Sequence, residues 1–382
     1  MKRRSGGPGG LDTRTAYTPI PDDRPMPTLT ARTIEDLSRT LLQAADVPAD
    51  EAATVAEHLA DANLVGHDSH GIQRVPEYVQ RIRDGIYLPA APFDLISQTS
   101  TTGVYDGGWG LGQVQAGRAL DELLAKARQH GCATVGLRKV GHIGRLGFYV
   151  QRAAEAGMLA MCSVNGHNVI QTVAPWGGVQ RRLGTNPIAY GAPSGMGFAI
   201  VYDVATSAAA EGKVRLYHKQ GKPIADDWVI DKDGNRTTDP GAYYDGGALL
   251  PFGGLAGHKG FGLGFIVEVM TSALAGTGQV DTPTWRFGCN GVYMTAVHIE
   301  AMMPLSRFCD DVDRLIGHVK SSRKAPGVDQ ILVPGEFEAQ TRSARTREGV
   351  HIDPETWRQL DECGQALGVK LDTFAQQADM AG

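Results

Sequence analysis

Apolar side chains recur every three or four residues in two stretches near the start of the chain, the first at Ala52, Val55, Ala56, Leu59 and Ala60 and the second at Ile72, Val75, Tyr78, Val79 and Ile82. This spacing predicts two amphipathic helices within a mainly helical region from about residue 30 to residue 86. Pro76 lies inside the second stretch, so that helix is expected to be bent there or to begin later than Ser69. The polar residues 66–74 therefore form a helix–helix junction.

From residue 103 the pattern changes to short apolar runs that alternate with helical periodicity. Strands are expected at 133–137, 158–164, 188–190, 198–202 and 292–299, and helices at 116–129 and 146–156. A hairpin turn is expected at 231–235, and a Gly-rich approach at 251–262 should lead into an apolar helix. Residues 305–371 look mostly helical apart from a loop at 325–336. The pattern predicts an α/β middle between helical ends.

Composition restricts the class of protein. The 382 residues, 42% hydrophobic and 21% charged, are ordinary for a soluble globular chain with a substantial core. The formal net charge of −5 gives no electrostatic case for nucleic acid or an anionic membrane as a partner. Five cysteines without paired spacing favour reduced thiols in a cytoplasmic protein. Residues up to about 26 look like a flexible extension, and no segment has the apolar length of a transmembrane helix.

The junction at 66–74 gathers side chains that can carry chemistry: His67, Asp68, Ser69, His70 and Arg74. If His70 lies in the first turn of a helix, the helix dipole should lower its pKa and leave an imidazole that can accept a proton from an alcohol. Arg74, four residues later, would share a helix face with His70 and suits a carboxylate-bearing substrate. The alternative is a capped helix junction with a surface arginine, and these residues alone leave both open.

A second candidate is the segment 140–145, which follows a predicted strand and opens a predicted helix. Ligands favour the carboxyl ends of strands, and helix N-termini bind anions. The glycines at 141 and 144 would let a cofactor approach the backbone, and His142 lies between them. The segment is not the G-x-G-x-x-G dinucleotide motif, and a plain strand–helix turn is the alternative.

Three further short segments have both a structural and a functional interpretation. Thr185 lies in a turn signature, Gly184-Thr185-Asn186-Pro187, and could also hydrogen-bond a ligand. Asp203 ends an apolar strand and is either a helix cap or a partner that orients a histidine. His258 and Lys259 stand at a predicted helix start, where cations favour a compensating anion such as phosphate unless both side chains point into solvent.

Six motifs occur in a fixed order along the chain: Gly66-His67-Asp68-Ser69-His70-Gly71, Gly141-His142-Ile143-Gly144, Gly184-Thr185-Asn186-Pro187, Asp203-Val204-Ala205-Thr206-Ser207, His258-Lys259-Gly260 and Ala325-Pro326-Gly327 with Pro334-Gly335-Glu336. Together they resemble the malate/L-lactate dehydrogenase family that lacks the usual Rossmann fold. The resemblance covers about residues 29–371. Each motif is weak singly, whereas six in order are specific.

The resemblance implies an α/β fold with a mixed-sheet nucleotide-binding domain of non-Rossmann type and a helical domain built from both chain ends. The corresponding boundaries are an extension at 1–28, helical parts at 29–100 and 301–382, and an α/β domain at 101–300. It also implies NAD or NADP as cofactor and a homodimer. The implied activity is hydride transfer between nicotinamide and a small 2-hydroxy or 2-oxo acid.

Residue roles follow from the same resemblance. Ser69 and His70 match a relay hydroxyl and a proton-transfer histidine, Arg74 a ligand of the substrate carboxylate, and Asp203 an acid near the site; Thr185 joins the substrate contacts. Cofactor contacts are expected from His142, Ile143, Gly144, Arg145, Leu146, Asp203, Val204, Ala205, His258, Lys259, Pro334, Gly335 and Glu336. Some relatives assign proton transfer to the counterpart of His142, so the choice between His70 and His142 stays open.

Three alternatives compete with this interpretation. A cyclic imino acid reductase of the same family would reduce an imine carbon next to a carboxylate. A metal-dependent hydrolase is conceivable because His67 and His70 have His-x-x-His spacing, although no complete ligand set is visible and no metal is expected. A non-catalytic paralogue would bind nucleotide without turnover.

Overall fold

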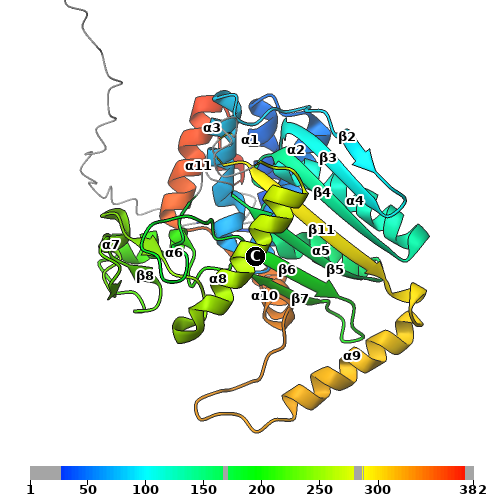
Figure 1. Cartoon of the computed structure of the whole chain (residues 1–382). Helices are drawn as coiled ribbons and strands as arrows, with labels where there is room; N and C mark the ends of the chain where they lie inside the picture. The colour runs from blue at the N-terminus through cyan, green and yellow to red at the C-terminus, as the bar shows by residue number, and fades with distance from the viewer. Residues whose placement is uncertain (1–26, 167–170, 279–285, 287, 375–382) are drawn as a thin grey trace, which may run out of the picture.

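The computed structural model describes residues 27–166, 171–278, 286 and 288–374, so nearly all of the expected N-terminal extension lies outside the described residues. Within them, a seven-stranded sheet carries helices on both faces, a helical layer lies beside one end of the sheet, and a small three-stranded unit lies at the periphery (Figure 1). The predicted α/β fold with a mixed sheet is confirmed.

The central sheet has the order β2-β3-β4-β11-β5-β6-β7. Its strands are β2 (Asp94–Gln98), β3 (Thr102–Gly110), β4 (Cys132–Val140), β11 (Asn290–His298), β5 (Met158–Asn165), β6 (Ile188–Ala192) and β7 (Ile200–Val204). Only β3 and β4 pair in parallel, whereas all the other neighbours are antiparallel. A doubly wound dinucleotide fold would be mostly parallel. The sheet is therefore of the non-Rossmann kind, and β2 joins it although it precedes the boundary expected at residue 101.

Successive side chains of β4 point to opposite faces of the sheet, and different helices cover the two faces. Val135 and Leu137 are buried in the core beneath α4 (Gly112–His130) and α5 (Leu146–Glu155). Gly136, between them, faces the opposite way, and a Cβ there would lie 2.8 Å from the Cβ of Ala275. That second face carries α8 (Gly257–Glu268) and its π-helical continuation Val269–Leu274 (Figure 1).

Both ends of the described chain meet in one helical core. It contains α1 (Ala31–Ala44), α2 (Ala49–Leu64), α3 (Val75–Arg83) and α11 (Pro354–Leu367), and β1 (Thr28–Leu29) pairs antiparallel with β12 (Val350–His351). Leu59, Val79 and Leu360 are fully or almost fully buried in it. Helix α10 (Glu336–Glu348) packs beside α2, whereas α9 (Leu305–Lys320) stands away from the body with only Ile316 buried (Figure 1).

The small unit pairs three two-residue strands, β10 (Ala248–Leu249), β8 (Val229–Ile230) and β9 (Arg236–Thr237), beside α6 (Glu211–Lys219) and α7 (Gly241–Tyr244). The predicted hairpin turn at 231–235 is confirmed. Asp231 Oδ1 accepts hydrogen bonds from the backbone N–H groups of Asp233 and Asn235, both at 2.9 Å. Among the described residues, no helix has the length and apolar character needed to cross a membrane.

The junction between α2 and α3 differs from a simple helix start. Asp68–His70 and Ile72–Arg74 form two 3₁₀ turns, and α3 begins only at Val75. His70 therefore does not lie in the first turn of an α-helix, and of the alternatives that Pro76 left open the structure shows the later helix start. Proline fits the first helical turn because the N–H that it lacks would be unbonded there.

Asn63 of α2 holds this junction in place. Its Oδ1 accepts from the backbone N–H of Ile72 at 2.8 Å, and its Nδ2 donates to Asp68 Oδ1 at 2.7 Å. Gly71 leaves room for this amide, since an added Cβ would lie 2.2 Å from Asn63 Oδ1. One buried amide thus fixes both 3₁₀ turns and the side chains that they carry.

Asn63→Ala should lower the free energy of unfolding by about 1–3 kcal/mol, because it leaves the buried N–H of Ile72 without a partner. Urea denaturation followed by circular dichroism measures this loss. The control is Gln80→Ala on α3, which removes an exposed hydrogen bond to Asp84 and should change stability by less than about 0.5 kcal/mol. Equal losses of stability in the two variants would show that Asn63 does not hold the junction in place.

Candidate active site

A cavity of about 650 Å³ lies where the 66–74 junction, the end of β4 and the edge of the sheet meet. Its walls include every residue for which the sequence predicted a catalytic or substrate-binding role: Ser69, His70, Arg74, His142, Thr185 and Asp203. These residues come from four separate parts of the chain. The fold therefore brings together side chains that sequence motifs only suggested to be related.

His70 faces the cavity from the first 3₁₀ turn. Its Nδ1 shares a hydrogen bond of 2.9 Å with the hydroxyl of Ser69. Its Nε2 has no hydrogen-bond partner among the described residues. Burial first, and then the positive charge of Arg74, lower the pKa of His70 to about 3. His70 is therefore a neutral imidazole, as predicted, but burial and the charge of Arg74 cause this, not a helix dipole.

His142 approaches the same cavity from the loop between β4 and α5. Its Nδ1 lies 2.8 Å from the hydroxyl oxygen of Tyr78, and its ring stacks beside that of His70 with centroids 5.5 Å apart. Burial, followed by the charge of Arg74, lowers the pKa of His142 well below its ordinary value. Two neutral imidazoles thus lie side by side in the cavity wall.

Arg74 lies in the second 3₁₀ turn and lines the cavity. Its Nε donates to the backbone oxygen of Ser69 at 2.6 Å, and its Nη1 donates to Glu77 at 2.7 Å. Its Nη2 makes no hydrogen bond within the described part of the chain. These two bonds fix the guanidinium plane and leave one nitrogen for a ligand. Such an arrangement suits a carboxylate.

Asp203 and Thr185 also line this cavity. Asp203 Oδ2 accepts from the backbone N–H of Gly147 at 2.7 Å, in the first turn of α5, and burial raises the pKa of its carboxyl. Of the two interpretations of Asp203, the structure therefore shows a carboxylate that bonds to a helix N-terminus. No histidine bonds to Asp203 among the described residues. The Thr185 carbonyl accepts from the Thr206 N–H at 2.8 Å, and Thr185 lines the cavity. The segment 184–187 does not form the predicted turn.

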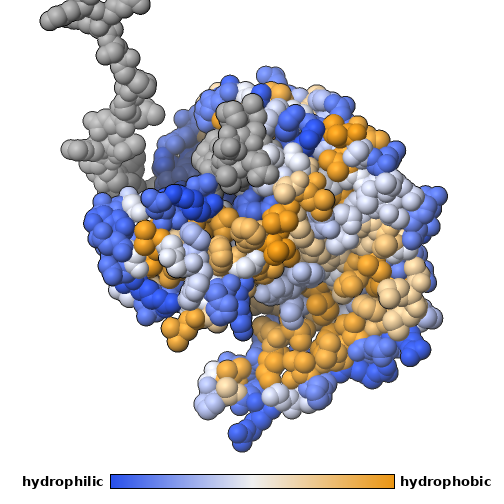
Figure 2. All heavy atoms as spheres, viewed as in Figure 1, coloured by the Kyte–Doolittle hydropathy of each residue, from blue (hydrophilic) through white to orange (hydrophobic). Residues whose placement is uncertain are grey.

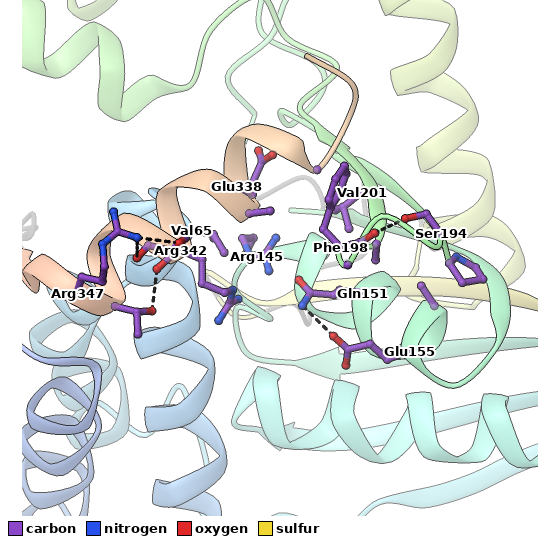
Figure 3. A pocket seen from close by; sticks show the side chains of 18 residues that line it. Val65, Arg145, Gln151, Glu155, Ser194, Phe198, Val201, Glu338, Arg342 and Arg347 are labelled. Carbon is purple, nitrogen blue, oxygen red and sulfur yellow. Dashed lines mark hydrogen bonds between the residues drawn. The ribbon is translucent and has the colours of Figure 1, made fainter. Parts of the chain in front are cut away.

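A second cavity, of about 730 Å³, adjoins the first at Arg145, which lines both. In Figure 3, Glu338 and Arg342 on α10 face Gln151 and Phe198 across it, with Arg145 between the two sides. The Arg145 side chain is 1% exposed and donates to Asp61 at 2.8 Å, and Arg342 donates to the same carboxylate. Burial alone would raise the pKa of Asp61, but these two cations lower it. Asp61 therefore stays ionised and compensates both arginines.

The expected cofactor contacts divide into two groups. Those that line a cavity are His142, Gly144, Arg145, Leu146, Asp203, Ala205 and Gly335. Those that line neither are Ile143, Val204, His258, Lys259, Pro334 and Glu336. His258 and Lys259 stand in the first turn of α8, as predicted, with exposed side chains. Their role in cofactor binding stays a prediction.

The two histidines of the His-x-x-His spacing do not converge. His67 Nε2 lies 3.4 Å from Glu338 of α10, whereas His70 turns to Ser69. Within the described ranges no three histidine, cysteine or acidic side chains are placed to hold a metal ion. The described residues therefore contain no ligand set that would support the metal-dependent hydrolase.

Several polar residues at the site were not identified from the sequence. Tyr78 contacts His142 from the helical core, and Gln113 of α4 donates to the Tyr78 hydroxyl. The sequence pattern placed Tyr78 on an apolar helix face. Asn290 Oδ1 accepts from the Ile143 N–H at 3.1 Å, and its Nδ2 donates to the Asn165 carbonyl at 2.9 Å. Asn165 directly follows the predicted strand 158–164, and this polar strand end was the available signal. Tyr78 and Gln113 carried none.

Comparison with known proteins relates this chain to one family. Residues 29–361 match the family described as malate/L-lactate dehydrogenase. The L-lactate dehydrogenase of Cupriavidus necator is 35% identical over 342 residues, which cover 88% of this chain and 97% of that protein.

Solved structures agree with the sequence match. Malate dehydrogenase from Entamoeba histolytica superposes with a TM-score of 0.86 at 29% identity, covering 91% of this chain and 99% of that one. Delta1-piperideine-2-carboxylate reductase from Pseudomonas syringae pvar. tomato gives a TM-score of 0.76 at 30% identity, with 88% and 99% coverage. The predicted resemblance is confirmed, and the chain belongs to the malate/L-lactate dehydrogenase family.

Proposed function

We propose that this chain is an NAD- or NADP-dependent oxidoreductase that interconverts a small 2-hydroxy acid and its 2-oxo acid. The observation that carries the proposal is one cavity lined by two imidazoles of lowered pKa and by Arg74, whose Nη2 makes no hydrogen bond to any described residue. A proton acceptor and a carboxylate ligand are the two groups that this substrate class requires. The names of the related proteins support the same class.

The residues around the two cavities fit a nicotinamide dinucleotide. Both cavities have volumes usual for cofactor sites, and Arg145 joins them. Arg145 Nε is buried without a hydrogen-bond partner among the described residues, so an acceptor on a ligand would satisfy it. Gly144 has φ +78°, and a Cβ there would lie 2.3 Å from His58 Nε2, so only glycine lets the backbone line the cavity here. We assign the cofactor to Gly144, Arg145, Leu146 and Asp203, and to Gly335 in the second cavity.

When bound, the oxidised nicotinamide supplies the acceptor for a hydride from the alcohol carbon, and in its reduced form it supplies the donor. His70 Nε2 takes the proton of the substrate hydroxyl as that carbon loses its hydride, so a 2-hydroxy acid leaves as the 2-oxo acid. Arg74 holds the carboxylate and thereby orients the neighbouring carbon. The carboxylate also offsets the charge of Arg74 that depresses the pKa of His70, and so favours proton uptake.

A second candidate function is the reduction of a cyclic imino acid. It is favoured by the structural similarity to delta1-piperideine-2-carboxylate reductase. Such a substrate also carries a carboxylate next to the reacting carbon, so Arg74 would serve both. The difference lies at the reacting atom, which would be an imine nitrogen in place of a carbonyl oxygen.

We further propose a homodimer, as the resemblance implies. Exposed apolar side chains on α8 and its continuation support a contact surface: Phe265, Ile266, Val269 and Leu274. Figure 2 shows hydrophobic side chains gathered over this helix on the face in view. A second copy is the partner assigned to that surface.

A nicotinamide-absorbance screen tests the proposed activity. The purified protein is assayed with both cofactors against lactate, malate, sulfolactate, their 2-oxo acids and a cyclic imino acid. Turnover with at least one 2-hydroxy or 2-oxo acid is expected. Turnover of the imino acid alone would replace the first function by the second, and nicotinamide binding without any turnover would indicate a non-catalytic paralogue.

Substitutions at His70 and Arg74 should have different kinetic effects. His70→Ala should lower kcat by about 10²–10⁴-fold, the usual cost of losing a proton-transfer group. Arg74→Ala should mainly raise KM, because it removes a charged contact worth about 2–5 kcal/mol. Steady-state kinetics and cofactor titrations separate these effects.

Two variants serve as controls for this comparison. Arg74→Lys keeps the charge and should give an intermediate KM. Arg83→Ala removes an exposed arginine at the end of α3, outside the cavity. Near-normal activity of His70→Ala together with loss of activity in His142→Ala would transfer the proton role to His142.

A further inference from the structure

We propose that Tyr78 and Gln113 are positioning residues that hold His142 in the tautomer with its proton on Nε2. His142 then donates a hydrogen bond to the reacting oxygen of the substrate and leaves proton transfer to His70. The inference rests on the proposed dehydrogenase function and assigns separate tasks to its two histidines. It concerns two residues that no sequence motif contains.

The inference starts from a chain of two hydrogen bonds. Gln113 Nε2 donates to the hydroxyl oxygen of Tyr78 at 2.9 Å, and that oxygen lies 2.8 Å from His142 Nδ1. A phenol carries a single proton. Because the amide N–H already donates to the oxygen, Tyr78 directs its own proton to His142 Nδ1. In a neutral ring with an accepting Nδ1, the proton lies on Nε2.

Burial keeps every member of this chain in one protonation state. Tyr78 is 1% exposed and Gln113 is 2% exposed. Burial raises the pKa of Tyr78 to about 12, so the phenol retains its proton. The same effect lowers the pKa of His142 well below its ordinary value, so a second proton on this ring is disfavoured. His142 is therefore a fixed donor across the usual pH range.

The backbone of His142 is fixed as well. Its N–H donates to the hydroxyl oxygen of Tyr87 at 3.0 Å, and Tyr87 donates to the Gly288 carbonyl at 2.8 Å. Tyr78 and Tyr87 thus hold the ring and the main chain of one histidine from the helical core. With both anchored, Nε2 is the remaining polar atom of the ring, and the side chain lines the cavity.

His70 has a contrasting environment. Its Nδ1 partner is the hydroxyl of Ser69, which is exposed and can rotate to donate or to accept. A hydroxyl that can change role allows the imidazole to gain and lose a proton. In the oxidation direction, His70 takes the hydroxyl proton as the alcohol carbon loses its hydride. The Nε2–H of His142 donates to the same oxygen, which becomes the carbonyl oxygen; reduction reverses these movements.

The test reads the tautomer directly. The full-length protein is labelled with ¹⁵N-histidine, and two-bond ¹H–¹⁵N correlation spectra report which ring nitrogen of His142 carries the proton. His142→Gln assigns its signals by their disappearance. We expect a protonated Nε2 and a bare Nδ1 in the wild type, and Tyr78→Phe should lose this single tautomer because Nδ1 loses its donor.

The matched control is Tyr87→Phe, which removes a hydroxyl that contacts the backbone of the same histidine. It should leave the ring tautomer unchanged. In kinetics, Tyr78→Phe should lower kcat by up to about 10²–10³-fold, the usual effect of losing a donor to a developing oxyanion, with a smaller change in KM. Gln113→Leu should shift the spectrum in the same direction as Tyr78→Phe without altering the phenol itself.

A proton on Nδ1 in the wild type would overturn the proposal, because the relay would then run from His142 through Tyr78 to an accepting Gln113. An unchanged tautomer in Tyr78→Phe would overturn it equally. Since the spectra need neither substrate nor cofactor, they separate this inference from the proposed function. A protein with the Nε2–H tautomer and no turnover in the screen would keep the first and lose the second.

Discussion

The hydrogen bond between Tyr78 and His142 joins the helical core to the sheet, and the site depends on this contact. Tyr78 belongs to α3, whose start is set by Pro76 and by the hydrogen bond from the Ile72 N–H to Asn63 Oδ1. His142 belongs to the loop that follows β4, in the middle of the chain. Because α3 and β4 come from different cores, neither segment alone forms the cavity. The catalytic geometry is thus a property of the packing between them.

Burial of the two histidines away from water is the second feature on which the site depends. Burial, followed by the positive charge of Arg74, lowers the pKa of both His70 and His142, and Arg145 adds to this effect at His70. The cations are themselves compensated, Arg74 by Glu77 and Arg145 by Asp61. The Arg145–Asp61 pair is buried, so removing one of its partners should be strongly destabilising, whereas the Arg74–Glu77 pair is partly exposed. The result is a cavity whose wall combines an arginine held by two hydrogen bonds with two imidazole rings of lowered pKa.

Much of this could be predicted from the sequence. The helices α2, α4 and α5 and the strands β4, β5 and β11 followed from periodicity, whereas β2 and β3 of the same sheet were not predicted. Six ordered motifs identified the family and many of the residues that line the main cavity. The start of α3 stayed open in the sequence, because Pro76 allowed either a bent helix or a later start, and the structure shows the later start at Val75. Tyr78 and Gln113 could not be recognised, since a buried tyrosine on an apolar helix face is usually core. Their role depends on a contact across 64 positions of sequence between Tyr78 and His142.

The most direct test of this account is a crystal structure of the protein with nicotinamide cofactor and an unreactive 2-oxo acid analogue. The account predicts the analogue's carboxylate on Nη2 of Arg74 and its oxo oxygen within hydrogen-bond distance of His142 Nε2, beside His70. A carboxylate bound away from Arg74, or an oxo oxygen in contact with neither histidine, would contradict it.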